Sequence, residues 1–402
     1  MKRLSFLLIV LLAIWSCSSD KTNEQLLHKI DNIENGLVSF MPGAQIDSAE
    51  TQAAMSLSER MNLHKIPGVS VAVINDFKIE WAKAYGILSA ESAEPVTTES
   101  IFEAASSTKM LVAVLALDFV ERGLLDLDRD VNEYLKSWKI PENDFTRENK
   151  VTLRLLLTHQ SGLNRPDGGF SWEDDSSPTL VQVLNGELPA QNQPAKIEFV
   201  PGSSWQYSNM GYLVIQLLLE DISGKPLTQI AREIVFSPLG TKSSTLEHPL
   251  DAQSGKKEAV PHDADGNAHA PVMHPTALAQ GGLMTTPSDF ALLAIELMRA
   301  NQGESDQILS QNMMQSMFHK ELDLDPAIFG GIPVGQGMGV FLQGDDQGFT
   351  FAHPGDNYPG SSCWVEGSPA TGKAIVIMTN GAMGNLLAME ILPAVKREYN
   401  WP

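Results

Sequence analysis

The sequence predicts a mixed α/β fold of the α+β type, in which one antiparallel sheet is built from both termini and flanked by helices. Strand-like alternation of apolar residues occurs near the start of the chain and returns near its end, while helical patterns and long loops fill the middle. Strands at both ends favour one shared sheet, and residues 124–335 then form a mostly helical second lobe. A cleft is expected where this lobe meets the sheet.

The first strands are predicted to form a β-hairpin. Apolar side chains alternate over residues 69–73 and again over residues 79–85, on either side of an Asn-Asp turn. Two runs of period two around such a turn are typical of two paired strands. A helix is expected to follow from Ser106 and to end near Gly123, because glycine commonly lies just past the end of a helix.

The middle and the end of the chain carry further signals. Ser177-Pro178 and Thr286-Pro287 each match a helix cap followed by proline at the first helical position. The clearest helical segments are residues 151–158, 179–184, 213–221 and 287–300. Strand patterns follow at residues 339–342, 350–352, 362–366 and 373–378, before a final helix over residues 386–398 that contains Pro393.

The composition excludes several classes of function. The chain has 402 residues and a formal net charge of −21 at pH 7, which argues against nucleic acid or an anionic lipid surface as a partner. Its nine histidines form no H-E-x-x-H motif and no cluster with cysteine, so neither a metal nor another cofactor is expected. One of the two cysteines, Cys363, lies in a strand-like segment and is expected to be buried and inert.

The first 16 residues are expected to be a signal peptide. Lys2 and Arg3 form a basic start, and residues 6–15 are an unbroken apolar run that is too short to span a bilayer. The next residue is Cys17, and the segment around it resembles a bacterial lipobox, in which the cysteine becomes the lipidated N-terminus. The alternative is an ordinary cleaved leader with an incidental cysteine.

This N-terminus predicts an exported bacterial lipoprotein that is held at a membrane and faces the periplasm. Residues 17–50 would be the lipid-anchored tether and residues 51–400 a single domain. Ser18, directly after the lipidated cysteine, is compatible with the outer membrane.

Residues 106–109 read S-x-x-K and precede an apolar run. On a helix, Ser106 and Lys109 are three positions apart and share one face, so their side chains can touch. A serine beside a lysine amine at the start of a helix is one way to build an activated nucleophile, and the backbone N–H groups there favour a developing anion. The alternative is that Ser106 is only a helix cap and Lys109 a surface residue.

Two further motifs follow S-x-x-K along the chain, and their order strengthens the interpretation of Ser106 as a nucleophile. Residues 207–209 read Y-S-N and residues 353–355 read H-P-G. Together the three motifs resemble those of the penicillin-recognising serine hydrolases, a superfamily of class C β-lactamases, D,D-peptidases, D-aminopeptidases and esterases. The resemblance covers roughly residues 55–400 and implies a β-lactamase/transpeptidase-like fold.

The resemblance implies three catalytic residues. Ser106 would attack a carbonyl and become acylated, with Lys109 beside it to ease removal of its proton. Tyr207 would be the shared general base and acid, with its phenol held near Lys109 so that the phenolate is accessible near neutral pH. Outside this context, Tyr207 would be read as a core aromatic with a satisfied hydroxyl.

The resemblance also implies substrate-binding residues. Asn209 would hydrogen-bond the substrate carbonyl or Lys109, although it could simply form a turn. His353 and Gly355 would line the opposite wall on an edge strand, although His353 could also be structural. Backbone N–H groups of Ser106 and Asp356 would hold the oxyanion, and the Asp356 carboxylate beside them would disfavour anionic substrates.

Three further aromatic or histidine residues lie near these motifs. His159 is read as a structural, hydrogen-bonded residue at a helix end. Trp205 and Tyr358 flank the motifs and could either contact substrate or serve packing.

The main departure from the family concerns substrate. β-Lactamases typically have K-T-G where this chain has H-P-G, so the lysine that helps to recognise a substrate carboxylate is absent. We therefore expect a serine hydrolase that acts through an acyl-enzyme on a small ester or amide, as an esterase, D-aminopeptidase or D,D-carboxypeptidase would. β-Lactam hydrolysis is the alternative among enzymes, and a non-catalytic lipoprotein that binds cell-wall peptides is the alternative of another class.

Overall fold

The computed structural model describes residues 23–39, 53–166, 177–250, 255–270, 276–345 and 348–401. The predicted signal peptide and Cys17 lie outside these ranges. Within them, no helix is both long and apolar enough to cross a membrane. The chain divides into two compact units, one made of Met1–His64 with Leu386–Pro402 and the other of Lys65–Asn385.

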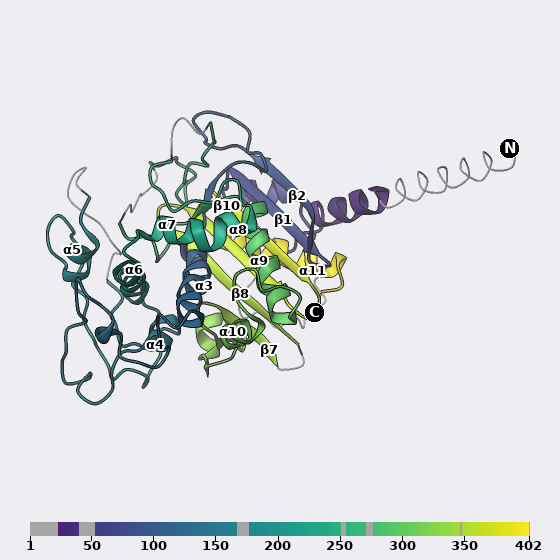
Figure 1. Ribbon diagram of the computed structural model, residues 1–402. Helices are drawn as coiled ribbons and strands as arrows, with labels where there is room; N and C mark the ends of the chain where they lie inside the picture. The colour runs from purple at the N-terminus through teal and green to yellow at the C-terminus, as the bar shows by residue number, and fades with distance from the viewer. Residues whose placement is uncertain are drawn as a thin grey trace, which may run out of the picture. The chain divides into compact units, whose positions relative to one another are not determined.

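The larger unit is built on an antiparallel eight-stranded sheet in the order β2-β1-β10-β9-β8-β7-β6-β5 (Figure 1). Because β1 pairs with β10, strands from both ends of the sequence lie side by side, and this confirms the predicted sheet. The strands are β1 Gly68–Asn75, β2 Lys78–Gly86, β5 Leu322–Asp323, β6 Gly335–Gln336, β7 Phe341–Asp345, β8 Gly348–Asn357, β9 Ser361–Ser368 and β10 Lys373–Thr379. A separate two-stranded sheet joins β3 Phe102–Glu103 to β4 Met284–Thr285.

The helices of this unit either pack on the sheet or gather beside it. The helix α9 contacts β1, β2, β9 and β10, whereas α4 and α5 pack on α6, and α6 contacts α3 (Figure 1). The α-helices are α3 Thr108–Glu121, α4 Leu153–Leu157, α5 Leu180–Asn185, α6 Asn209–Ser223, α7 Leu227–Ala231, α8 Ser237–Leu239, α9 Pro287–Gln302 and α10 Gln311–Met317. The 3₁₀ turns are η1 Ala105–Ser107, η2 Val131–Glu133 and η5 Pro326–Phe329, and a π-helical turn spans Arg232–Phe236.

The helix α3 forms the centre of the larger unit. All its residues from Thr108 to Phe119 are buried, and it contacts both α6 and β8. A helix that is apolar on every side belongs in a protein interior. Lys109 and Asp118 are the charged residues among these buried residues, and Lys109 lies in the first turn with no exposed surface.

Several predicted boundaries change in the structure. The cap predicted at Ser177-Pro178 is wrong, because Thr179 caps α5 in a capping box with Gln182. The strand predicted from residue 339 begins only at Phe341, since Gly339 has a φ of 75°, in the left-handed region. The region predicted as a helical lobe, residues 124–335, also contains the short strands β4 and β5 and the start of β6.

The described part of the smaller unit contains a helix over residues 23–34, α2 Leu57–Leu63 and most of α11 Gly384–Glu398. Ser56 and Glu59 form a capping box at the start of α2. Glu390 on α11 is fully buried and binds Arg60 at 2.6 Å and His64 at 3.1 Å. This buried carboxylate therefore joins α2 to α11.

We expect Glu390→Ala to lower the free energy of unfolding by about 3–5 kcal/mol, because it leaves the buried Arg60 guanidinium without its partner. Denaturant titration of the full chain measures this loss. The matched control is Asp265→Ala, which removes the exposed ion pair with Lys65 and should cost less than about 1 kcal/mol. Equal losses in the two variants would contradict the role of Glu390.

Candidate active site

Ser106 lies in the 3₁₀ turn η1, directly before α3, rather than in the α-helix itself. The residue before it, Ala105, has a φ of 47°, which is uncommon for a residue with a side chain. Strained backbone of this kind persists only where its surroundings hold it, and it is concentrated at functional sites. Here it sets the turn that leaves Ser106 partly exposed while Ser107 on the next position is buried.

Lys109 makes two short contacts with its amine. Its Nζ lies 3.2 Å from Ser106 Oγ and donates to the backbone carbonyl of Gln280 at 2.6 Å. Burial lowers the pKa of Lys109 well below its ordinary value, and the positive charge of Arg165 lowers it further. The lowered pKa favours the neutral amine, which can accept the Ser106 proton while the Gln280 carbonyl holds one of its N–H groups.

Tyr207 joins the same group of side chains. Its phenol hydrogen-bonds to Ser106, and its ring centroid lies 4.9 Å from Lys109 Nζ. Burial raises the pKa of Tyr207 above its ordinary value, and the contacts with Ser106 and Arg165 only partly oppose this shift. The direction of this shift favours the protonated phenol and is opposite to the accessible phenolate expected from the sequence.

The strand β8 brings the third motif to Ser106. β8 lies between β9 and β7 in the sheet, so the edge strand expected from the sequence is wrong. β7 pairs with β8 only as far as Ala352, and residues 353–357 pair with β9. Ser107 Oγ donates to the His353 carbonyl at 2.8 Å. A methyl group added to Gly355 would lie 3.0 Å from Ser106 N and 2.3 Å from the Ala104 carbonyl oxygen. Glycine thus allows β8 to pass directly over the nucleophile's backbone.

His353 is buried and its ring faces the site. The ring centroid lies 6.3 Å from that of Tyr207 and 5.2 Å from that of Phe341. Its Nδ1 donates to the Pro354 carbonyl at 2.8 Å. Burial, together with Lys109, lowers the pKa of His353 to about 3, so the ring is neutral and forms an uncharged wall.

Asp356 and Asn209 differ in how well they match their expected roles. Successive side chains of a strand point to opposite faces, so the Asp356 carboxylate lies away from the face that Gly355 presents to Ser106. It accepts a hydrogen bond from Ser362 Oγ at 3.1 Å, and the predicted repulsion of anionic substrates by Asp356 loses its basis. Asn209 begins α6, and its buried Oδ1 has no hydrogen-bond partner among the described residues.

The contacts and exposure of the flanking residues bear on their roles. His159 is buried, and its Nδ1 accepts the backbone N–H of Ser208 at 3.1 Å, so it is structural as predicted. Trp205 donates to Gln336 Oε1 at 3.0 Å, and Tyr358 is 82% exposed. Cys363 is free and buried, and burial raises its pKa to about 12, which makes it inert as predicted.

The structure adds three residues that the motifs did not assign. Gln280 holds the Lys109 amine through its carbonyl, and the guanidinium of the exposed Arg165 lies 5.5 Å from the centroid of the Tyr207 ring. Glu103 is a buried carboxylate bonded to Asn357. The contact of Gln280 could not be predicted, because a backbone carbonyl leaves no trace in residue identity. Glu103 lies three residues before Ser106, a position that alone predicts no contact.

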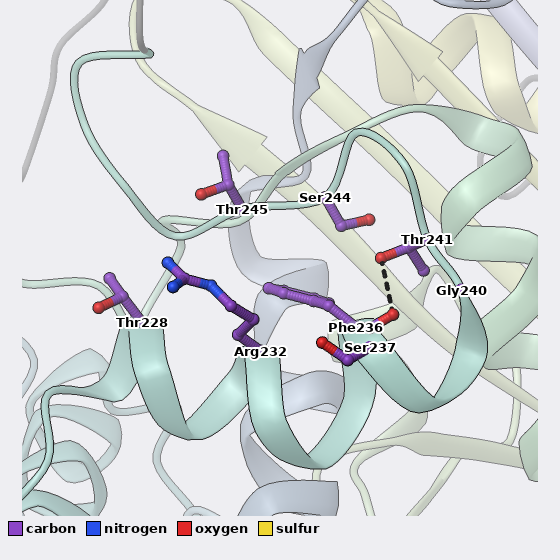
Figure 2. A pocket seen from close by; sticks show the side chains of 8 residues that line it. All are labelled: Thr228, Arg232, Phe236, Ser237, Gly240, Thr241, Ser244 and Thr245. Carbon is purple, nitrogen blue, oxygen red and sulfur yellow. Dashed lines mark hydrogen bonds between the residues drawn. The ribbon is translucent and has the colours of Figure 1, made fainter. Parts of the chain in front are cut away.

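A cavity of about 390 Å³ lies elsewhere in the larger unit (Figure 2). It is lined by Thr228, Arg232, Phe236, Ser237, Gly240, Thr241, Ser244 and Thr245, none of which belongs to the three motifs. Arg232, the only charged side chain that lines it, already pairs with Glu247. In the described ranges, no group of three or more histidine, cysteine or acidic residues could hold a metal ion.

Sequence comparisons show which known proteins this chain resembles. A putative D-alanyl-D-alanine carboxypeptidase of Escherichia coli O157:H7 is 29% identical over 225 residues, which are 52% of this chain and 49% of that protein. This chain therefore spans about half the length of that relative. Esterase EstB of Burkholderia gladioli is 28% identical over 286 residues, which are 65% of this chain and 71% of the esterase.

Solved structures share the fold. The structure of SurE with D-Leu has a TM-score of 0.67 and 26% sequence identity, and the match covers 85% of this chain and 74% of SurE. The octameric penicillin-binding protein homologue from Pyrococcus abyssi has a TM-score of 0.68 and 23% identity, with 85% and 77% covered.

A family model that covers the whole candidate site identifies the family of this chain. The model of the Beta-lactamase family matches residues 55–395, a range that contains the S-x-x-K, Y-S-N and H-P-G motifs. The match also includes Gln280, whose carbonyl binds Lys109. The chain therefore belongs to the Beta-lactamase family.

Proposed function

We propose that the protein is a serine hydrolase that cleaves a small ester or amide through an acyl-enzyme on Ser106. The observation that carries the proposal is the contact of the Lys109 amine, whose pKa is lowered by burial, with Ser106 Oγ at 3.2 Å. A serine hydroxyl is a weak nucleophile until a base removes its proton. An amine with a lowered pKa can act as that base near neutral pH.

Acylation would proceed by transfer of the Ser106 proton to Lys109 Nζ as Oγ bonds to the substrate carbonyl carbon. The carbonyl electron pair moves to oxygen, and the oxyanion is held by the backbone N–H groups of Ser106 and Asp356. Removal of one such donor typically raises the barrier by about 2.7–4 kcal/mol. Gly355 supports this arrangement because its lack of a side chain lets β8 reach the turn that carries Ser106.

Collapse of the oxyanion breaks the bond to the leaving group, which needs a proton. The Tyr207 phenol is protonated and hydrogen-bonded to Ser106, so it can donate that proton and regain one from the Lys109 ammonium. Water then attacks the acyl-enzyme by the reverse sequence and releases the acid. Asn209 would orient the substrate carbonyl group through its side-chain amide.

The residues that line the site indicate which class of substrate it accepts. His353 is uncharged, and an apolar cluster of Leu324, Val334 and Phe341 packs against Trp205 and Tyr207. These walls favour a small ester or amide with an apolar group. The named activities of relatives, an esterase and a putative D-alanyl-D-alanine carboxypeptidase, agree with this reaction type. β-Lactam hydrolysis and cell-wall peptide binding without turnover are the competing outcomes.

The test is a panel of small esters, D-amino-acid amides, D-alanyl-D-alanine peptides and the β-lactam nitrocefin, with wild type and Ser106→Ala compared. We expect ester or amide turnover by the wild type and none by the variant. Turnover of nitrocefin alone would favour a β-lactamase. Peptide binding without any turnover would favour a binding protein.

We further propose that the protein is exported and held at a bacterial membrane, facing the periplasm, by a lipid on Cys17. The support is the basic start, the apolar run and the lipobox-like segment that precedes Cys17. Cys17→Ser should release the protein from the membrane fraction and abolish incorporation of radiolabelled palmitate. Membrane retention of this variant would overturn the anchor.

A further inference from the structure

One buried acidic residue beside the site has no part in the reaction described above. Glu103 lies on β3, three residues before Ser106, and only 7% of its surface is exposed. Carboxylates are rarely buried this fully unless a partner holds them. No basic side chain in the described ranges forms an ion pair with it, and its carboxylate is held instead by the neutral side-chain amide of Asn357.

Through Asn357, Glu103 is connected to two segments that contact Ser106 or Lys109, namely β8 and the Gln280–Gly281 turn. Its Oε2 accepts a hydrogen bond from Asn357 Nδ2 at 2.8 Å, and the same Nδ2 lies 3.4 Å from the Gly281 carbonyl oxygen. Asn357 ends β8, two residues after the Gly355 that lies over Ser106. Gly281 directly follows the Gln280 whose carbonyl binds Lys109.

The turn at Gly281 is itself packed on the nucleophile's turn. A methyl group added to Gly281 would lie 3.4 Å from the carbonyl carbon of Ala105 and 3.2 Å from Asn357 Oδ1. The amide of Asn357 thus spans β8 and the Gln280–Gly281 turn, and Glu103 fixes that amide from the segment that leads into Ser106. Three segments far apart in the sequence meet at one side chain.

We propose that Glu103 is a positioning residue, which acts through Asn357 to hold β8 and the Gln280–Gly281 turn in register with Ser106 and Lys109. The proposal rests on the proposed function, because the register matters only if Ser106 is the nucleophile. A misplacement of about 1 Å in such a group can cost about 10²-fold in rate.

The charge of Glu103 gives the proposal a second readout. Burial raises the pKa of Glu103 to about 7, with the nearby Glu258 carboxylate as a minor cause and the Asn357 hydrogen bond in opposition. Among the described residues, Asn357 and the half-buried Glu258 are the groups that act on this carboxyl. The ionised carboxylate accepts the stronger, charge-assisted bond, so the hold on Asn357 tightens as pH rises through about 7.

The first test measures the maximal rate at which a fluorophosphonate labels Ser106, together with kcat and KM on a small ester. We expect Glu103→Ala and Asn357→Ala each to lower the labelling rate and kcat about tenfold or more, with little change in KM. The double variant should be no slower than the slower single variant, because the two residues act as one unit. Unchanged rates, or effects that multiply in the double variant, would overturn the proposal.

The second test uses Glu103→Gln, which keeps an acceptor for Asn357 but cannot ionise. We expect the wild-type pH–rate profile to contain an inflection near pH 7 that this variant lacks. Asp118→Asn is the matched control, since Asp118 is also buried with a raised pKa but pairs with Arg122. The Asp118→Asn control should keep the inflection. An inflection that persists in Glu103→Gln would overturn the proposal, and this test remains valid even if Glu103→Ala fails to fold.

The two proposals fail in different ways. A wild type that is not labelled at Ser106 and turns over no substrate would sink the proposed function. A wild type that is labelled at Ser106, with Glu103 variants that match its rates and its pH profile, would sink only the role of Glu103.

Discussion

Lys109→Met is expected to lower kcat by about 10²–10⁴-fold while the protein remains folded, because it removes the base that takes the Ser106 proton. Methionine is close to lysine in size and suits a position with no exposed surface. The amine is desolvated and faces no carboxylate in its described contacts, so its replacement by an apolar side chain should leave thermal stability unchanged or raise it.

The pH dependence of stability gives an independent check of the same residue. The pKa of Lys109 is lowered in the folded protein, so the unfolded chain binds a proton that the folded chain does not. Stability should therefore rise with pH between the lowered pKa and about 10.4, the ordinary lysine value. Lys109→Met should remove this part of the slope in denaturant titrations. A variant that keeps both the slope and the activity would contradict the assignment.

Gly355→Ala is expected to lower kcat about 10²-fold, because the added methyl group collides with backbone and displaces the groups around Ser106. It would lie 2.3 Å from the Ala104 carbonyl oxygen and 3.0 Å from Ser106 N, so β8 or the η1 turn must move. The matched control is Gly348→Ala in the same strand, where an added methyl group meets no atom of the described residues within 4 Å. Steady-state kinetics on a small ester measure both variants, and equal rates would show that Gly355 is not in contact with the nucleophile's turn.

The fold could be predicted largely because its signals are local or lie at the ends of the chain. The alternation in residues 69–85 and 373–378 marks the strands β1, β2 and β10, whose pairing closes the sheet. The long helices α6 and α9 also follow from apolar periodicity. Boundaries were harder, because the cap of α5 depends on a side-chain bond between Thr179 and Gln182 rather than on the Ser-Pro pair before it.

In the site, too, contacts between residues close in sequence could be predicted, whereas contacts between distant residues could not. The spacing of S-x-x-K places Ser106 beside Lys109, and a contact within one turn of chain can be read from sequence. The bond from Lys109 to the Gln280 carbonyl joins residues 171 positions apart and involves only backbone at the far end. The protonation state of Tyr207 was also out of reach, since it depends on how deeply the phenol is buried.

The most direct test of the central claim is the site of covalent modification. The full chain would be treated with a fluorophosphonate and digested, and the labelled peptide would be located by mass spectrometry. We predict one adduct, on Ser106, that forms much more slowly in Lys109→Met and not at all in Ser106→Ala. An adduct on another residue, or equal labelling of wild type and Ser106→Ala, would contradict the assignment of Ser106 as the nucleophile.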